Sequence, residues 1–127
     1  MAQVYPYFYK GKLRTKQDKC RAMIPLDRAR IWLDFNEYCA EDENTRDPIY
    51  LFSQADIVSD SEGNDIELCE GMEVFVFDYD LNSLNEPDAL LAQGILIKNF
   101  LEYYPNTEWL IRLTKNKEEY IYRMSDL

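Results

Sequence analysis

The chain has 127 residues, of which 46% are hydrophobic and 14% aromatic, and it carries a net charge of −10. This profile is typical of one globular domain over residues 1–127, and it excludes a wholly disordered or collagen-like chain. No apolar run approaches the ~20 residues that a membrane helix needs. Residues 1–10 also lack the basic and then apolar pattern of a signal peptide. The sequence therefore predicts a cytoplasmic protein without a membrane span.

Charge is sorted by position along the chain. Residues 1–30 carry a net charge of +6, residues 31–97 carry −16, and residues 98–127 carry none. Residues 1–20 form a basic, aromatic-rich segment ahead of a predicted β core over 21–127, and we expect this segment to lie near the acidic middle and partly neutralise it. A field of this kind attracts basic surfaces and repels nucleic acid and anionic membranes. A basic protein is therefore the expected partner.

Alternating aromatic and β-branched residues predict a series of short strands in the first two thirds of the chain. The expected strands cover 4–9, 21–26, 30–38, 49–53, 57–58 and 66–68. The segment 30–38 is also compatible with the start of a helix, although Ile31, Leu33 and Phe35 would share one face of a strand. An acidic turn over 60–65 contains Gly63 and Asn64, which tolerate the positive φ of a tight turn.

The strongest strand signal begins at Gly71 and runs through Phe77. Both of its faces are apolar after Glu73, which predicts a central strand. A loop over 82–88 leads to residues 89–98, which fit either a helical turn followed by a strand or one strand in which Gly94 marks a bend or bulge. Residues 115–117 are expected to form a hairpin turn between strands at 108–114 and 119–124.

These elements predict a mainly β fold, either a small antiparallel barrel or a sandwich, with room for one or two short helices. A strand that starts with Gly-Met, an acidic loop, a strand with an internal glycine and a closing hairpin follow one another over residues 50–124. This order resembles an SH3-like barrel, which is the favoured architecture. The resemblance is architectural and implies no functional residues.

Nothing in the sequence resembles an active site. The chain has no histidine, and it has no G-x-S-x-G, P-loop or G-x-G-x-x-G motif. We therefore expect a non-enzymatic protein without cofactors, while a glycosidase that uses only carboxylates stays formally open. The cysteines Cys20, Cys39 and Cys69 form no C-x-x-C pair, which predicts reduced thiols, with one disulfide as the alternative.

One acidic segment partly matches a calcium-binding loop. Asp78, Asp80, Asn82 and Glu86 fall at alternating positions, as the oxygen ligands of an EF-hand do. However, Ser83 stands where the loop needs glycine, and Ala89 stands where it needs a bidentate glutamate. A solvated acidic loop is therefore expected, and weak calcium or magnesium binding is the alternative.

The remaining acidic residues predict either a solubilising face or a docking surface for a basic partner. The candidate partner-binding residues are Glu41, Asp42, Glu43, Asp60, Glu62, Asp65, Glu67, Asp78 and Asp80. Asp65 and Glu67 should share one strand face, and the tryptophans and tyrosines are expected mostly in the core. Reversal of Glu62, Asp65 and Glu67 to lysine should slow association with the partner.

Size, charge and the absence of histidine together suggest a binding protein that inhibits or neutralises a basic protein. A bacterial immunity protein against a toxin nuclease has this profile. The alternative is an SH3-like interaction or accessory module that binds a peptide or assembly through aromatic residues, without dependence on charge. A third hypothesis is a carboxylate enzyme or a calcium-dependent module.

Overall fold

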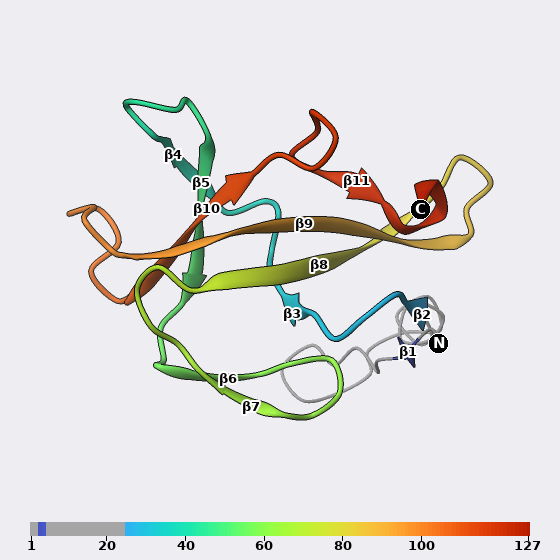
Figure 1. Ribbon diagram of the computed structural model, residues 1–127, viewed down its shortest axis with the longest axis horizontal. Coiled ribbons are helices and arrows are strands. Elements are labelled where there is room, and N and C mark those ends of the chain that lie inside the picture. The colour runs from blue at the N-terminus through green and yellow to red at the C-terminus, as the bar shows by residue number, and fades with distance from the viewer. Residues whose placement is uncertain (1–2, 5–24) are drawn as a thin grey trace.

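The computed structural model describes residues 3–4 and 25–127, and nearly all of its regular elements are strands (Figure 1). The elements are β1 (Gln3–Val4), β2 (Pro25–Leu26), β3 (Ile31–Trp32), β4 (Tyr38–Glu41), β5 (Pro48–Ser53), β6 (Ile57–Ser59), β7 (Asp65–Glu67), β8 (Glu73–Leu81), β9 (Pro87–Lys98), β10 (Trp109–Thr114), β11 (Tyr122–Arg123) and the 3-10 helix η1 (Met124–Asp126). The prediction of a mainly β chain is confirmed. The basic segment falls mostly outside the described residues.

Seven strands form one mixed sheet. The order is β3-β8-β9-β10-β5-β4, and β11 pairs with β9 beside β10. The pair β3–β8 is parallel and the other pairs of this sheet are antiparallel. The prediction of a purely antiparallel sheet is therefore wrong. Across the described residues it does not close into a barrel, because β3 and β4 stand at its two edges. The sheet is twisted, since β8 and β9 run across the view from side to side while β5 runs from top to bottom (Figure 1).

Both faces of β8 are buried, as the sequence predicted for a central strand. Val74 and Val76 belong to the larger core, which lies between the sheet and the β6–β7 hairpin. Phe77 and Tyr79 point to the other face and pack with Leu26 in a smaller core. Two long paired strands with apolar residues on both faces therefore form the centre of the fold.

Residues 87–98 form one strand that runs through Gly94 without interruption, so the strand alternative is confirmed, while the helical turn and the bulge at Gly94 are wrong. Pairing runs through Gly94 to Val74 of β8 on one side and to Leu113 of β10 on the other, without a register shift. A Cβ atom at this position would lie 2.5 Å from the backbone oxygen of Arg112 and 2.8 Å from Cγ1 of Ile111. Glycine is required here by close packing rather than by a turn.

The expected hairpin between residues 108–114 and 119–124 is also wrong, although the chain does turn there. Lys117 and Glu118 have positive φ, and Asn116 and Glu119 form a bridge. The strands on either side, however, pair with β9 and not with each other: β10 pairs with residues 93–98, and β11 pairs with Leu90 and Leu91. Because β9 is twelve residues long, one edge of it accommodates both strands.

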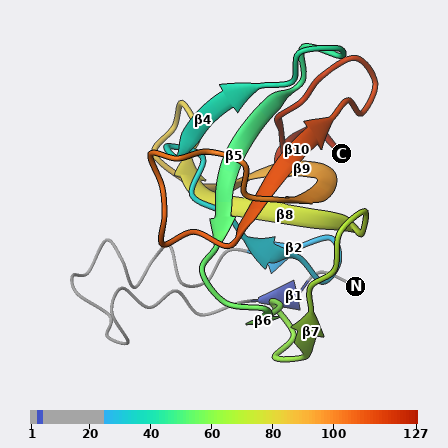
Figure 2. The same cartoon turned by 90° about the vertical axis from the view of Figure 1, so that its left-hand side faces the viewer.

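Residues 31–40 are neither one strand nor a helix. The strand β3 ends at Trp32, a loop follows, and β4 begins at Tyr38. The sheet edge formed by β4 lies at the top of both views, and the β6–β7 hairpin lies at the bottom (Figures 1 and 2). The two hairpins that carry most of the predicted docking residues therefore stand at opposite ends of the molecule.

Candidate functional site

The exposed edge of the sheet at β4 combines carboxylates with exposed aromatic rings. We define the β4 edge surface as Trp32, Asp34, Glu37, Tyr38, Glu41, Asp42 and Glu43. Three segments carry these residues: Trp32 ends β3, the loop after β3 carries Asp34 and Glu37, and the β4–β5 hairpin carries the rest. Trp32 is 42% exposed and Tyr38 is 53% exposed. Exposed aromatic residues of this kind are the usual anchors of protein interfaces.

The ring of Trp32 is held in one orientation by Asp78. The indole Nε1 donates to Oδ1 of Asp78 at 2.8 Å, and the backbone N–H of Phe35 donates to Oδ2 of the same carboxylate at 3.1 Å. Burial raises the pKa of Asp78, and the nearby charge of Asp34 acts in the same direction. Asp78, predicted as a partner contact, therefore positions Trp32 and the loop after β3.

A hollow of about 300 Å³ lies beside the exposed ring of Trp32. Its lining residues are Trp32, Asp34, Glu37, Leu51, Phe52, Ser53, Gln54 and Thr107. Neither Asp34 nor Glu37 forms an ion pair within residues 3–4 and 25–127. The hollow is therefore lined by two carboxylates without cationic partners among the described residues and by an aromatic side chain.

A second hollow of about 370 Å³ lies at the β4–β5 turn. Glu41, Asp42 and Glu43 line it together with Phe100, which is 60% exposed and comes from the loop between β9 and β10. Three of the predicted docking residues are thus brought together, and they gain an aromatic neighbour from a distant part of the chain. Arg46 Nε lies 2.9 Å from Glu41, but both side chains are exposed, so this ion pair contributes little stability.

Hydrogen bonds within the β4–β5 turn favour the ionised form of Asp42. Asp42 accepts the backbone N–H groups of Asn44 and Thr45, each at 2.9 Å, and these hydrogen bonds lower the pKa of its carboxyl. Asp47 is used internally instead: it accepts from Arg112 Nη1 at 2.7 Å and from the Tyr120 hydroxyl at 2.5 Å. Asp42 and its neighbours face solvent, while Asp47 ties the turn to β10.

The acidic residues of the β6–β7 hairpin divide into one structural residue and three exposed ones. Asp60 is 7% exposed and accepts the backbone N–H groups of Glu62 and Asn64 at 2.9 Å, so its carboxylate stabilises the turn. Glu62, Asp65 and Glu67 are exposed, and the last two share one face of β7 as expected. These residues lie at the opposite end of the molecule from the β4 edge surface (Figures 1 and 2).

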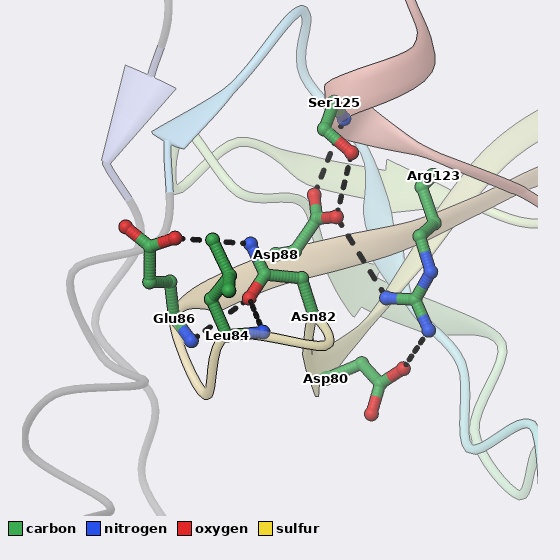
Figure 3. A network of polar contacts seen from close by, with 7 residues as sticks. All are labelled: Asp80, Asn82, Leu84, Glu86, Asp88, Arg123 and Ser125. Atoms are coloured by element: carbon green, nitrogen blue, oxygen red, sulfur yellow. Dashed lines mark hydrogen bonds and ion pairs between the residues drawn. The ribbon is translucent and has the colours of Figure 1, made fainter.

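Asp80 belongs to a polar network that closes the β8–β9 hairpin against the end of the described chain (Figure 3). Arg123 Nη2 donates to Asp80 at 2.7 Å, and Nη1 lies 3.7 Å from the buried Asp88. Ser125 donates to Asp88 from its backbone N–H and its hydroxyl, and Asn82 accepts the N–H groups of residues 84 and 86. Among the described residues no group of three or more acidic or cysteine side chains is arranged to hold a metal ion.

Trp32, Asp34, Glu37 and Phe100 were not predicted as site residues. The signal for Trp32 was present, since Ile31 and Leu33 share a buried face and therefore place the residue between them on the other side. Phe100 had no signal, because its position next to the β4–β5 turn depends on the pairing of β9 with β10 and of β10 with β5.

The two described cysteines are free, and they should differ in reactivity. Burial and the charge of Glu37 raise the pKa of Cys39 to about 11, whereas Cys69 is exposed. At pH 8 Cys39 should therefore carry about 100-fold less thiolate than at its ordinary pKa of 9.0. Because Cys39 is also partly buried and Cys69 is exposed, iodoacetamide should label Cys39 far more slowly than Cys69. Peptide mass spectrometry over a labelling time course tests this, and equal rates at the two residues would contradict it. Cys20 lies outside the described residues.

Comparisons with protein-family models, with curated proteins and with solved structures find no match to this chain. In the part of the chain that the structure describes, no helix has the length and apolar character that crossing a membrane requires.

Proposed function

We propose that the protein is a non-enzymatic binding protein that docks through its β4 edge surface on a basic protein and inhibits or neutralises it. The observation that carries the proposal is that exposed aromatic rings line two hollows together with carboxylates, of which only Glu41 has a cationic partner among the described residues. Arg46 is the only base between residues 31 and 97. A basic surface would supply the missing charge, and the rings of Trp32 and Phe100 would supply apolar anchors.

The biological role that fits this proposal is protection against a harmful basic enzyme, as an immunity protein provides against a toxin nuclease. Such an inhibitor benefits from fast association, and electrostatic steering raises association rates to ~10⁸–10⁹ M⁻¹s⁻¹. The analogy rests on charge and size. Affinity capture on the immobilised protein, eluted in rising salt and followed by mass spectrometry, would identify the partner for the measurements below.

Reversal of two acidic residues should slow association with the purified partner by roughly tenfold at low salt and flatten the salt dependence of the rate. The variant is Glu37→Lys with Glu43→Lys, because neither side chain makes a hydrogen bond or ion pair within the described residues. The matched control is Glu62→Lys with Glu67→Lys, which changes the net charge equally on the β6–β7 hairpin. Stopped-flow measurement over a range of ionic strength gives the rates.

The control separates two locations of the docking surface. A strong effect of the Glu37 and Glu43 variant with a weak effect of the control supports the β4 edge surface. The reverse result would move the docking surface to Glu62, Asp65 and Glu67, which are also among the partner contacts predicted from the sequence. If neither variant changes the rate, docking does not depend on these charges and the proposal is wrong.

The exposed aromatic rings favour a second candidate, an interaction module that binds a peptide or assembly mainly through Trp32 and Tyr38. The SH3-like architecture predicted from the sequence belongs to this alternative. Its affinity should change little between low and high salt, whereas the affinity of a charge-dependent inhibitor should fall steeply. One salt titration of the complex therefore distinguishes the two functions.

A further inference from the structure

The hollow beside Trp32 has the features of a site for one cationic side chain. Its volume of about 300 Å³ lies at the lower end of the range for ligand sites, ~300–1,000 Å³, so it suits a side chain better than a larger ligand. Trp32 presents an exposed ring whose orientation is fixed by Asp78. A cation placed over such a ring is attracted by its electrons, and tryptophan gives the strongest effect of the aromatic residues.

The carboxylates of the hollow also favour a cation. Asp34 and Glu37 line it, and neither pairs with a base in the described part of the chain. The charge of Asp34 contributes to the raised pKa of Asp78, which indicates that the carboxylates around Trp32 repel one another. A bound cation would relieve this repulsion and make hydrogen bonds to both carboxylates that line the hollow.

The edge of β4 is a poor template for an added strand, which argues for recognition through side chains. The strand has four residues, and its pairing with β5 is irregular between Tyr38 and Ala40. Short edge strands with bulges are the usual devices that prevent edge-to-edge pairing. The hollow beside Trp32 is therefore the more specific recognition element of this surface.

We infer that the hollow formed by Trp32, Asp34 and Glu37 receives one arginine side chain of the basic partner. The guanidinium group would stack on the indole ring and donate to the two carboxylates, while its aliphatic stem packs on Leu51 and Phe52. Arginine fits better than lysine because its planar fork combines stacking with several hydrogen-bond donors. This inference rests on the proposed function, since it specifies the partner group that the β4 edge surface recognises.

The indole N–H signals of the two tryptophans allow a direct test with the intact protein. N-acetyl-arginine amide is titrated into ¹⁵N-labelled protein, and the signal of Trp32 should shift in a saturable way. The signal of Trp109 serves as an internal control, because this residue is 3% exposed and donates to Asp56. N-acetyl-citrulline amide, a neutral probe of nearly the same shape, should produce no shift, and the lysine analogue should bind more weakly.

A matched pair of conservative variants locates the site. Glu37→Gln should weaken binding of the arginine probe about fivefold, as expected for loss of an open ion pair of ~1 kcal/mol. Glu43→Gln removes the same charge outside this hollow and should leave the affinity nearly unchanged. Asp34→Asn should act like the Glu37 variant, while its side chain can still accept the N–H of Asn36.

Several outcomes would overturn the inference. They are the absence of a shift at Trp32, equal shifts with the arginine and citrulline probes, equal binding of the lysine analogue, or equal effects of Glu37→Gln and Glu43→Gln. In these cases the proposed function still stands if association with the partner depends on salt and on the lysine substitutions at Glu37 and Glu43. If the association rate changes neither with salt nor with the lysine substitutions, the proposed function itself is wrong.

Discussion

Replacement of Arg30 by alanine is expected to destabilise the protein by about 3 kcal/mol. Arg30 is 2% exposed, and its guanidinium group forms a two-point contact with Asp27 at 2.8 and 2.9 Å. Its Nη1 also donates to the backbone oxygens of Val76 and Ala92, which belong to β8 and β9. Truncation removes this additional donor from the two strands and leaves the Asp27 carboxylate without its cationic partner. Urea denaturation followed by circular dichroism measures the loss.

Arg28 provides a matched control for this prediction. Its guanidinium carbon lies 3.5 Å from the ring centre of Phe75, but the residue is exposed, so Arg28→Ala should cost less than about 1 kcal/mol. Arg30→Lys keeps the charge but loses the fork and should fall between the two. Equal losses for Arg28→Ala and Arg30→Ala would show that the contacts of Arg30 do not stabilise the fold.

The Arg30 effect should depend on pH with a definite sign. Burial opposes the charge of Asp27, but its hydrogen bond and ion pair with Arg30 outweigh this and lower the pKa of Asp27 below the ordinary 3.8. A lowered carboxyl pKa adds stability above the ordinary pKa, and this stability is lost as the pH falls through the folded value. The difference in the free energy of unfolding between the parent protein and Arg30→Ala should therefore be largest at pH 7. It should decrease as the pH falls below 3.8.

Substitution of Gly94 by alanine is expected to cost about 3 kcal/mol, the upper part of the range for overpacked cores. The added Cβ would meet the backbone oxygen of Arg112 at 2.5 Å, and a backbone atom cannot move aside as a flexible side chain can. Relief requires β9 and β10 to separate, which weakens their ladder of hydrogen bonds. Thermal and urea denaturation would record the loss, with an intermediate result expected if the strands adjust locally.

Gly63 is the corresponding control for this substitution. It has a positive φ of 81° in the β6–β7 turn, and a Cβ there would meet no atom within 4 Å. Gly63→Ala should therefore show only the conformational cost of a left-handed residue, ~1–2 kcal/mol. If Gly94→Ala is no more harmful than Gly63→Ala, the close approach of β9 and β10 does not constrain this position.

Local patterns in the sequence were sufficient to locate those elements whose structure depends on their own residues. The alternation through Phe77 located β8, and the Asp-Ser-Glu-Gly-Asn run at 60–64 located the β6–β7 turn. They failed where the partner of a strand is distant in sequence. Nothing near Trp109 or Tyr122 indicates that both β10 and β11 pair with β9, and the two residues of β3 do not reveal a parallel pairing with β8.

The candidate site was predictable in composition but not in arrangement. The acidic character of 41–43 and 60–67 was evident, whereas the division between exposed carboxylates and internally bonded ones was not. The carboxylates of Asp60 and Asp78 instead accept hydrogen bonds from nearby backbone N–H groups. Trp32 became a site residue because its face of β3 has no covering element, which depends on the arrangement of the whole sheet.

The long strand β9 has a consequence for how the protein is made. One edge of β9 pairs with β8, which is synthesised earlier. The other edge stays unpaired until β10 and β11 have been synthesised. Until Arg123 has emerged from the ribosome, a nascent chain carries a twelve-residue, largely apolar strand segment with an unpaired edge. Such edges recruit other strands. Ribosome-bound chains that stop before Trp109 should therefore depend on chaperones to remain soluble.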